Sequence, residues 1–334
     1  MADSNSIAWD EQEIAALTAK VGELKASMAR VIIGQEDVVN LLVTCLLAGG
    51  HALVEGVPGL GKTLLVKSLA QATDKQFRRV QFTPDLMPSD IVGTEILEED
   101  QATRQRAFRF QPGPVFTQGL LADEINRAPP KTQSALLEAM QERSVTFAGQ
   151  THKLPRPFFV LATQNPIEQA GTYPLPEAQL DRFLLRIDVG YPTEDEEMRM
   201  VSATTHGGLQ DAPPAMDVAA LLQLQALVRE IEIGEHLLRW ATRLVRATRP
   251  AETTVDAVKK HVGWGAGPRA GQSLVLASKA RALMQGRLAV TREDIAAMLL
   301  PVLAHRVLRN FEAEADGVLM ADILGKLVEQ IRPE

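Results

Sequence analysis

Residues 56–63 read G-V-P-G-L-G-K-T, a complete phosphate-binding loop of the form G-x-x-x-x-G-K-[ST]. Its glycines allow successive backbone N–H groups to curl around phosphate oxygens, and Lys62 adds a point charge for the β- and γ-phosphates. Thr63 offers its hydroxyl to Mg²⁺ at the start of a helix, whose dipole also favours anions. A glycine-rich turn could match by accident, but an apolar strand at 52–55 and a helical stretch at 64–70 flank the loop as required. The sequence therefore predicts that a nucleoside triphosphate binds here.

The composition is that of a globular protein long enough for two domains. The 334 residues carry a formal net charge of −7 and contain no apolar run of membrane-spanning length. The polar start, residues 1–6, lacks the basic and apolar segments of a secretory signal, and the single cysteine, Cys45, excludes an intrachain disulfide. We therefore expect a cytoplasmic protein without a membrane span. The negative charge makes a nucleic-acid partner less expected, without excluding a basic patch.

A change of pattern near residues 190–192 divides the chain. Before it, short apolar strands alternate with helical stretches, which predicts a parallel sheet covered by helices. The expected strands are residues 52–55, 79–83, 120–123, 158–163 and 183–188. After it only helical periodicity is found, and an amphipathic helix at 14–28 leads into the first part. The expected division is an N-terminal helical lead-in at 1–30, an α/β nucleotide-binding core at 31–191 and a helical domain at 192–334.

Two further strand ends complete the expected site. The stretch L-L-A-D-E at 120–124 ends in two carboxylates, of which Asp123 would orient the Mg²⁺ shell and Glu124 would polarise the water that attacks the γ-phosphate. The strand at 158–163 runs into Asn165, whose amide could hold that water. Acids exposed to solvent and an Asn-Pro turn are alternatives that these residues alone leave open. The sequence has no N-K-x-D guanine-recognition motif, which favours ATP over GTP.

Two longer stretches carry a specific resemblance. Residues 120–142 read L-L-A-D-E-I-N-R-A-P-P-K-T-Q-S-A-L-L-E-A-M-Q-E, and residues 162–183 read A-T-Q-N-P-I-E-Q-A-G-T-Y-P-L-P-E-A-Q-L-D-R-F. Both resemble the MoxR family of AAA+ ATPases, and the match extends to V-I-I-G-Q-E-D-V at 31–38 and G-A-G-P-R-A at 265–270. Gly267 departs from the commoner G-A-S-P-R-A wording of that family. The resemblance implies an α/β fold: an AAA+ P-loop NTPase core, with a parallel five-stranded sheet between helices, followed by a small all-helical lid domain.

The resemblance also implies roles for individual residues. Asp123 and Glu124 match the family's Walker B acids, and Asn165 matches its sensor 1. Arg182 matches an arginine finger that reaches a neighbouring subunit's γ-phosphate, and Arg269 matches sensor 2 in the lid. The residues expected to contact the nucleotide, including the segment that frames the adenine, are Ile33, Gly34, Gln35, Gly56, Val57, Pro58, Gly59, Leu60, Gly61, Lys62, Thr63, Leu64 and Asp123.

Other interpretations of these side chains stay open. Arg182 could pair with Asp181 or another nearby acid, and Arg269 could be an exposed helix-cap residue. An alternating stretch at 144–154 predicts a β-hairpin, and a second insertion is expected near 95–114; each could touch a substrate or pack between subunits. Two isolated histidines without metal-ligand spacing are expected to be structural, namely His152 and His305.

The implied function is that of an ATP-hydrolysing ring motor with ATP and Mg²⁺ as cofactors. If Arg182 acts on a neighbouring subunit, hydrolysis requires assembly, and the resemblance suggests a hexamer. MoxR-like ATPases are associated with von Willebrand factor A (VWA) domain proteins and act as chaperones in metal-cofactor insertion or complex maturation. The resemblance therefore implies a VWA-domain partner and a client complex. A magnesium-chelatase-like motor subunit and a DNA-remodelling AAA+ ATPase are the alternatives.

Overall fold

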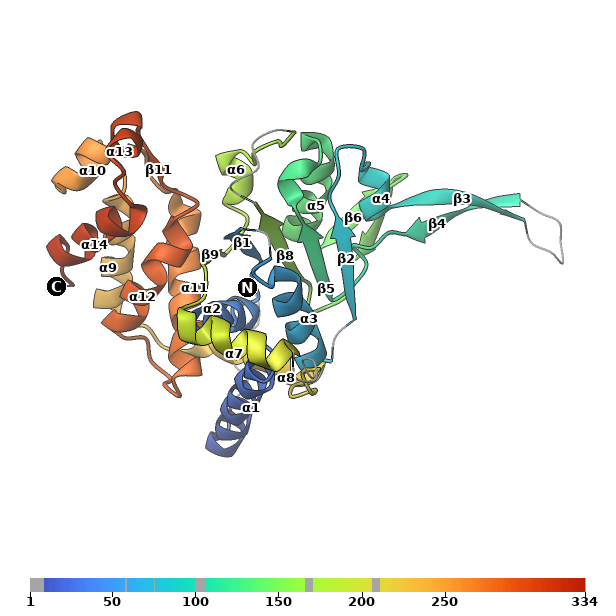
Figure 1. Cartoon of the computed structure of the whole chain (residues 1–334), viewed down its shortest axis with the longest axis horizontal. Helices are drawn as coiled ribbons and strands as arrows, with labels where there is room; N and C mark the ends of the chain where they lie inside the picture. Colours follow the sequence, from blue (N-terminus) through green and yellow to red (C-terminus); the bar gives the residue numbers. More distant parts are fainter. Residues whose placement is uncertain are drawn as a thin grey trace, which may run out of the picture.

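The computed structural model describes residues 9–57, 59–74, 76–99, 106–165, 171–205 and 211–333. At its centre lies a parallel five-stranded sheet with the strand order β2-β5-β8-β1-β9 (Figure 1). Its strands are β1 (Ala52–Gly56), β2 (Phe77–Gln81), β5 (Gly119–Asp123), β8 (Phe159–Gln164) and β9 (Leu185–Val189). The expected sheet is confirmed. β2 begins earlier in the chain than expected, because its pairing with β5 already starts at Phe77 opposite Gly119.

The sheet order determines which strand ends meet. All of its strand pairs are parallel, so the carboxyl ends of all the strands lie on the same side of the sheet, which we call its carboxyl edge. β1 ends at Gly56, where the phosphate-binding loop begins, and β5 ends at Asp123, with β8 between them. Ligands of open parallel sheets bind beyond the carboxyl ends of the strands. The loop and the acids therefore meet where such a ligand is expected.

Alternate residues of the strands face two separate apolar clusters. Leu120 and Ala122 are buried in a cluster with helix α5 (Pro130–Glu142), whereas Leu121 lies in a cluster with α2 (Glu36–Leu47) and α3 (Lys62–Ala72). This alternation follows from the two-residue period of a strand. Shorter helical turns on the core are α4 (Pro88–Val92), η1 (Ile125–Arg127) and α6 (Glu177–Leu180).

Helix α1 (Glu11–Ala29) confirms the amphipathic helix predicted at the N-terminus. It begins with a capping box formed by Asp10 and Glu13. Its buried side chains include Leu17, Val21, Leu24 and Met28. They lie in the cluster of α2 and α3, and α1 also contacts helices of the C-terminal part. The lead-in segment is thus an integral part of the apolar core.

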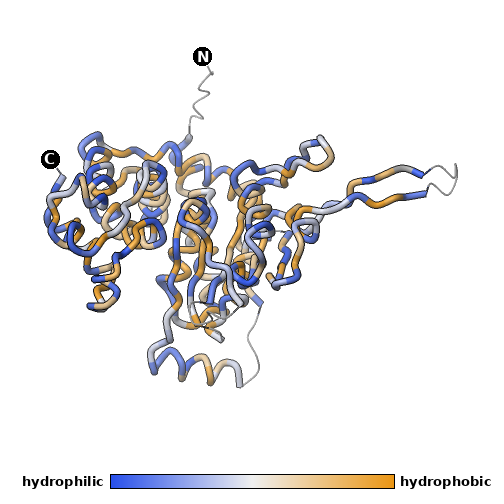
Figure 2. The backbone as a smooth tube through the Cα atoms, turned by 90° about the horizontal axis from the view of Figure 1, so that it is seen from above, coloured by the Kyte–Doolittle hydropathy of each residue, from blue (hydrophilic) through white to orange (hydrophobic). Residues whose placement is uncertain are grey.

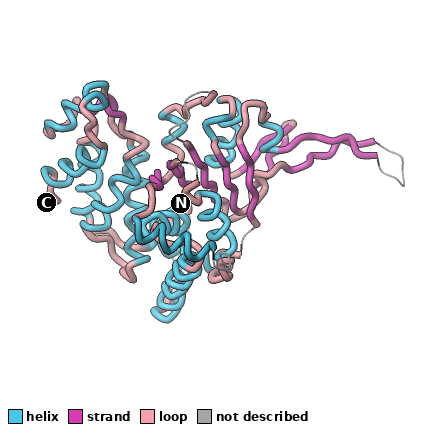
Figure 3. The backbone as a smooth tube through the Cα atoms, in the orientation of Figure 1, coloured by secondary structure: helices cyan, strands magenta, loops and turns pink. Residues whose placement is uncertain are grey.

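The part of the chain after β9 is mainly helical (Figure 3). Its helices are α7 (Glu194–Thr205), α8 (Val218–Glu230), α9 (Glu235–Arg246), α10 (Asp256–His261), α11 (Pro268–Met284), α12 (Arg292–Leu303), α13 (Phe311–Ala315) and α14 (Met320–Gln330). Buried side chains of α8, α9, α11, α12 and α14 belong to the same apolar cluster as α1, α2 and α3. One short antiparallel pair interrupts the helices, between β10 (Val262–Trp264) and β11 (Leu308–Arg309). Strands this short carry no periodicity from which they could be predicted.

Two β-hairpins leave the core. β3 (Gly93–Glu99) and β4 (Arg106–Pro112) form an arm that projects away from the body (Figure 1, Figure 2). β6 (Ser144–Phe147) and β7 (Gln150–Lys153) form the second hairpin, at the position predicted from the sequence. The ring of Phe110 stacks on His152 with 4.3 Å between ring centroids, which ties the arm to the second hairpin. Among the described residues, no helix has both the length and the apolar character needed to cross a membrane.

Candidate nucleotide-binding and hydrolysis site

The phosphate-binding loop connects β1 to α3. Gly59 and Gly61 have φ angles of 86° and 76°, left-handed values that glycine adopts without steric cost. The Nζ of Lys62 donates hydrogen bonds to the carbonyl oxygens of Gly56 at 2.6 Å and of Gln164 at 3.2 Å. The ammonium group therefore lies between the carboxyl ends of β1 and β8, where it can meet a phosphate.

The surroundings of the loop fit a bound phosphate. A Cβ atom at Gly59 would meet no atom within 4 Å, so its backbone angle rather than crowding requires glycine, and the space beside it is open. Helix α3 begins directly after Gly61, and the first N–H groups of a helix lack intrahelical acceptors. Thr63 is exposed in that first turn. Pro58, which was expected to contact the nucleotide, lies outside the described residues.

Asp123 is held from both neighbouring strands. Arg79 of β2 forms an ion pair with it, with 2.6 Å between Nη2 and Oδ2. Thr163 of β8 donates a hydrogen bond from Oγ1 to the other carboxylate oxygen, Oδ1, also at 2.6 Å. The residue is only 8% exposed. Its carboxylate is therefore fixed in orientation at the edge where the loop lies.

Glu124 follows in an unusual backbone conformation. Its φ angle is 55°, in the left-handed region that non-glycine residues rarely occupy, and such strain is often found at functional sites. Its backbone N–H donates to Thr163 Oγ1 at 2.9 Å. Its carboxylate oxygen Oε2 accepts a hydrogen bond from Gln81 Nε2 at 2.7 Å and pairs with Arg127 Nε at 3.1 Å. The turn thus directs the second acid away from the strand.

Asn165 lies beside the phosphate-loop lysine. It is 4% exposed and directly follows Gln164, whose carbonyl accepts a hydrogen bond from Lys62. The candidate sensor 1 thus lies at the carboxyl end of β8, the strand between β1 and β5. The lysine, the acids and this amide therefore come together at adjacent strand ends.

The segment expected to frame the adenine connects α1 to α2. Gly34 and Gln35 both have left-handed φ angles, of 71° and 55°. The side-chain amide of Gln35 donates to the carbonyl of Leu60 at 3.4 Å, which ties the segment to the phosphate loop. A Cβ atom at Gly34 would lie 2.6 Å from Cδ of Glu196, a flexible side chain that could shift, so the left-handed backbone angle is the stronger reason for glycine here.

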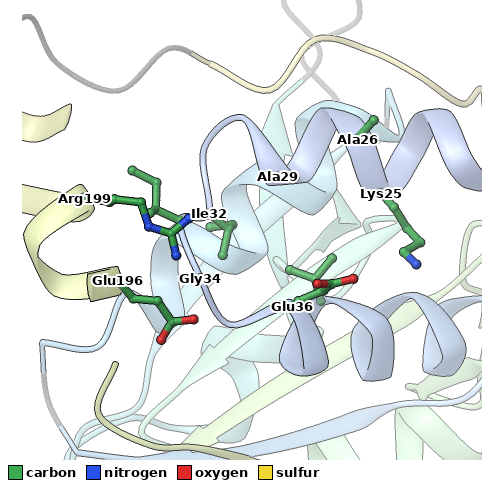
Figure 4. Close-up of a pocket in the computed structure, with 10 residues that line it drawn as sticks. Lys25, Ala26, Ala29, Ile32, Gly34, Glu36, Glu196 and Arg199 are labelled. Carbon is green, nitrogen blue, oxygen red and sulfur yellow. The ribbon is translucent and has the colours of Figure 1, made fainter. Parts of the chain in front are cut away.

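A cavity of about 590 Å³ borders this segment (Figure 4). Ile32, Ile33 and Gly34 form one part of its wall, and the rest comes from α1, α2 and α7. In Figure 4 the side chains of Glu196 and Arg199 extend from α7 toward the segment. The cavity is mixed in character, with the aliphatic Ile32 and Ile33 beside these charged groups.

The two candidate arginines lie near the amino ends of the strands, on the opposite side of the sheet from the phosphate loop; we call this side the amino edge. Arg182 precedes β9, and the N–H of Leu184 donates to the carbonyl of His51, which precedes β1. This position is the amino end of both strands. The five residues of β1 rise roughly 13 Å before the phosphate loop begins. The protomer's own loop is therefore beyond the reach of Arg182.

Arg269 is located in the same region. It lies in the first turn of α11, and its Nη1 is 3.7 Å from Oδ2 of Asp181. Arg306 pairs with the other oxygen of Asp181, with 2.7 Å between Nε and Oδ1. An ion pair between Asp181 and Arg182, the alternative that the sequence left open, is not formed among these described side chains. Both candidate arginines therefore lie at the amino edge.

Buried histidines have structural partners. Nδ1 of His51 accepts a hydrogen bond from the N–H of Val160 at 3.0 Å, and Nε2 lies 3.3 Å from the carbonyl of Met140. Burial lowers the pKa of His51 to about 4. Burial also lowers the pKa of His305 well below its usual range, and its Nε2 lies 3.0 Å from the Phe183 carbonyl. Within the described residues, His, Cys, Asp and Glu side chains form no cluster of three or more that could hold a metal.

Several partners of the expected site residues have no signal, or only a weak one, in the sequence. Arg79 and Gln81 are two positions apart on β2 and so share a face, which was a detectable signal. Their relation to the acids depends on β2 lying beside β5, which no local pattern encodes. Arg127 lies in the stretch 120–142 that carries the resemblance but was given no role, and Arg306 lies in none of the quoted motifs.

Comparison with known proteins identifies the class. Residues 51–185 match the family described as ATPase family associated with various cellular activities (AAA), and residues 255–327 match the AAA lid domain. The crystal structure of a presumed ATPase from Cytophaga hutchinsonii has a TM-score of 0.89 and 39% identity, over 97% of this chain and 98% of that chain. The fold and the site thus define an AAA+ ATPase with a helical lid.

Two relatives narrow the assignment. Chaperone MoxR1 of Mycobacterium tuberculosis is 41% identical over 320 residues, which cover 96% of this chain and 82% of that protein. Protein MoxR of Paracoccus denitrificans is 33% identical over 91% of each chain. The chain belongs to the MoxR family of AAA+ ATPases, which confirms the resemblance found in its motifs. It is accordingly a nucleotide-binding protein and an ATP hydrolase.

Proposed function

We propose that ATP binds with Mg²⁺ at the carboxyl edge of the sheet and is hydrolysed there. The observation that carries this proposal is the convergence of Lys62, the acids Asp123 and Glu124, and Asn165 at the ends of β1, β5 and β8. Backbone N–H groups of the loop and Lys62 would hold the β- and γ-phosphates. The segment around Gly34 would frame the adenine.

The residues at this edge divide the work of hydrolysis. Thr63 and Asp123 offer the hard oxygen donors that Mg²⁺ prefers and would hold the ion, which would supply positive charge to neutralise the phosphates. Asn165 would orient the attacking water, and Glu124 would accept its proton. The exposed Thr63 and the fixed carboxylate of Asp123 support this set of ligands.

The opposite position of Arg182 and Arg269 supports action between protomers. A finger in trans stabilises charge in the transition state and contributes roughly 10³-fold or more in rate. Arg182 lies at the amino edge, so we propose that each protomer supplies Arg182, together with Arg269, to its neighbour's triphosphate. Repetition of this contact would generate a ring, and the family favours a hexamer.

Glu124→Gln tests the hydrolytic role. The variant keeps the shape of the side chain but cannot accept a proton, so ATP binding persists while phosphate release falls by about 10²- to 10⁴-fold. Nucleotide binding and phosphate release are measured on the same preparation. Glu138→Gln, an exposed change on α5, is the matched control and retains wild-type turnover. Normal turnover in Glu124→Gln would remove Glu124 from its role.

We also propose a cellular role as a cytoplasmic chaperone that remodels a partner complex. The name of the Mycobacterium tuberculosis relative, a chaperone, supports this role over a magnesium-chelatase-like motor or a DNA-remodelling ATPase. A VWA-domain protein is the proposed partner, in complex maturation or metal-cofactor insertion. Tagged Glu124→Gln protein held with ATP should retain that partner during purification. ATPase stimulation by DNA, with no protein partner recovered, would contradict the chaperone role.

For the domain organisation we propose the division drawn from the sequence. It comprises a helical lead-in at 1–30, the core at 31–191 and the lid at 192–334. The family matches at 51–185 and 255–327 fall on either side of the proposed core–lid boundary, which supports it.

A further inference from the structure

Arg306 is a buried arginine that none of the proposed catalytic roles uses. Its side chain is 2% exposed, and it follows α12. Its guanidinium donates to the carbonyl oxygens of Phe183, Leu184 and Val302 at 2.6, 3.2 and 2.5 Å. A further hydrogen bond reaches the hydroxyl of Ser273 at 3.2 Å. A planar guanidinium with so many acceptors is held in one orientation.

A carboxylate lies between Arg306 and a second arginine. Arg306 donates from Nε to Asp181 Oδ1 at 2.7 Å and from Nη2 to the Asp181 carbonyl at 3.3 Å. The other oxygen, Oδ2, faces Nη1 of Arg269 at 3.7 Å. The side chain of Arg269 is 46% exposed, in contrast to that of Arg306. Arg306 is thus the buried member of this trio, and Arg269 is the exposed member.

The same contacts fix the backbone on both sides of Arg182. The carbonyls of Asp181, Phe183 and Leu184 all accept hydrogen bonds from Arg306. These residues form the connection between the end of α6 and the start of β9, where carbonyl groups need donors from outside a regular helix or strand. The end of α12 therefore determines how the connection that carries Arg182 is presented.

We infer that Arg306 is a positioning residue for hydrolysis between protomers. It fixes the backbone on both sides of Arg182 and sets the direction of Arg269 through Asp181, so that both arginines are presented to a neighbour's triphosphate. This inference rests on the proposed hydrolysis at a shared site. Arg306 is buried and acts only through these groups. A displacement near 1 Å in a catalytic group can reduce the rate by about 100-fold.

Arg306→Met tests the inference in the full-length protein. Met keeps an unbranched stem and removes every donor, so kcat for ATP falls by about 10- to 100-fold. The KM for ATP changes by less than about threefold, because the variant's own phosphate loop is intact. Arg306→Lys recovers only part of the rate, since one ammonium cannot replace the forked donors.

Arg281→Met is the matched control. Arg281 pairs with the buried Asp294 in the same group of helices, at a distance in sequence from residues 181–184. If the loss of any buried ion pair among these helices lowered kcat, Arg281→Met would show the same fall in kcat as Arg306→Met. We expect its kcat to stay within about threefold of wild type. Thermal unfolding of both variants reports any general loss of stability.

Mixed assemblies reveal on which side of the shared site Arg306 acts. Arg306→Met protomers retain a functional phosphate loop, and Lys62→Ala protomers retain functional arginines. Mixing the two should restore activity, because some shared sites then have both halves intact. Mixing Arg306→Met with Arg182→Ala should restore nothing, because both variants lack the same half. Pull-down through a tag on one variant verifies co-assembly.

The outcomes separate the inference from the function on which it rests. Arg182→Ala mixed with Lys62→Ala is the reference pair, and its failure to complement contradicts the shared site itself. If the reference pair complements but Arg306→Met does not complement Lys62→Ala, the positioning role is overturned. Should Arg306→Met not fold, Asp181→Asn replaces it, and the same two-sided pattern is expected. If Arg306→Met or Asp181→Asn restored activity when mixed with Arg182→Ala, the inference would also be overturned.

Discussion

Thr163 links the two acids of the candidate site. Its hydroxyl donates to Asp123 and accepts from the backbone N–H of Glu124. Thr163→Val has nearly the same shape but removes both hydrogen bonds and leaves buried polar groups without partners. We expect a loss of about 1–3 kcal/mol in the free energy of unfolding. ATP turnover should fall as well, because the acids lose their alignment.

Urea unfolding and phosphate release check this prediction. Thr163→Ser retains the hydroxyl and should keep most of the turnover, even if the lost methyl group costs some stability. Equal turnover losses in Thr163→Ser and Thr163→Val would show that packing, rather than the hydroxyl, matters at this position.

His51 makes stability depend on pH. Its pKa is about 4 in the folded protein against 6.5 when unperturbed, because burial disfavours the charged ring. The unfolded chain therefore takes up a proton as the pH falls below 6.5, while the folded chain resists it until about pH 4. The contribution of neutral His51 is complete above the unperturbed pKa and is lost as the pH falls. The expected loss from about pH 7.5 to pH 5 is about 2 kcal/mol.

His51→Gln isolates this contribution. The amide can still accept from Val160 and donate to Met140, but it does not titrate. Urea unfolding of both proteins at the two pH values gives the measurement. The stability difference between wild type and variant should shrink or reverse at the lower pH. A difference independent of pH would contradict the assigned cause.

The β3–β4 arm is an element largely independent of the core. Its cross-strand pair Leu97 and Phe108 is exposed, Phe108 to 72%. Replacing residues 96–109 with a short Gly-Ser turn retains Phe110 and its contact with His152. We expect the melting temperature to change by less than about 3 °C, because little buried apolar surface is lost. Differential scanning fluorimetry measures the change.

The base of the arm, in contrast to its exposed part, is packed closely against the core. A Cβ atom at Gly113 would collide with the carbonyl oxygen of Ile91, so that backbone would have to shift. Gly113→Ala should therefore lower the melting temperature more than removal of the whole arm. The reverse order would mean that the arm, rather than its base, is coupled to the core.

At the scale of elements, patterns over a few residues predicted the features that depend only on neighbouring residues. The phosphate loop, the strand ends at Asp123 and Asn165, and the hairpin at 144–154 were all found, because turn chemistry and alternation act over a few residues. The contacts of Asp123 with Arg79 and of Asp181 with Arg306 were not predicted from the sequence. They depend on sheet order and on helix packing, and the partners are far apart in sequence.

At the scale of the whole molecule, the placement of Arg182 at the amino edge predicts activity that depends on concentration. If the proposed shared site holds, isolated protomers would lack the charge stabilisation from a neighbour's arginine, so turnover per protomer should fall by roughly 10³-fold on full dissociation. Phosphate release across a dilution series, with light scattering at each concentration, measures this. Lys62→Ala gives the background. Undiminished turnover in solutions that contain only monomers would exclude a shared site.

The sequence could not place the two arginines relative to the loop. Their motifs name the residues, but the edge on which they lie follows from strand direction and from how α11 packs near residue 181. The family resemblance supplied the roles of Arg182 and Arg269. How far these two arginines lie from the protomer's own phosphate loop can be seen only in the folded structure.

The apolar cluster that joins α1, one face of the sheet and the lid helices limits how this ATPase can move. A wide hinge would expose that shared interior to water, so we expect nucleotide-driven motion to take the form of shear, in which packed helices slide by small steps. Heat should accordingly melt core and lid in one cooperative endotherm. A shift at the nucleotide would then pass from helix to helix through this shared cluster.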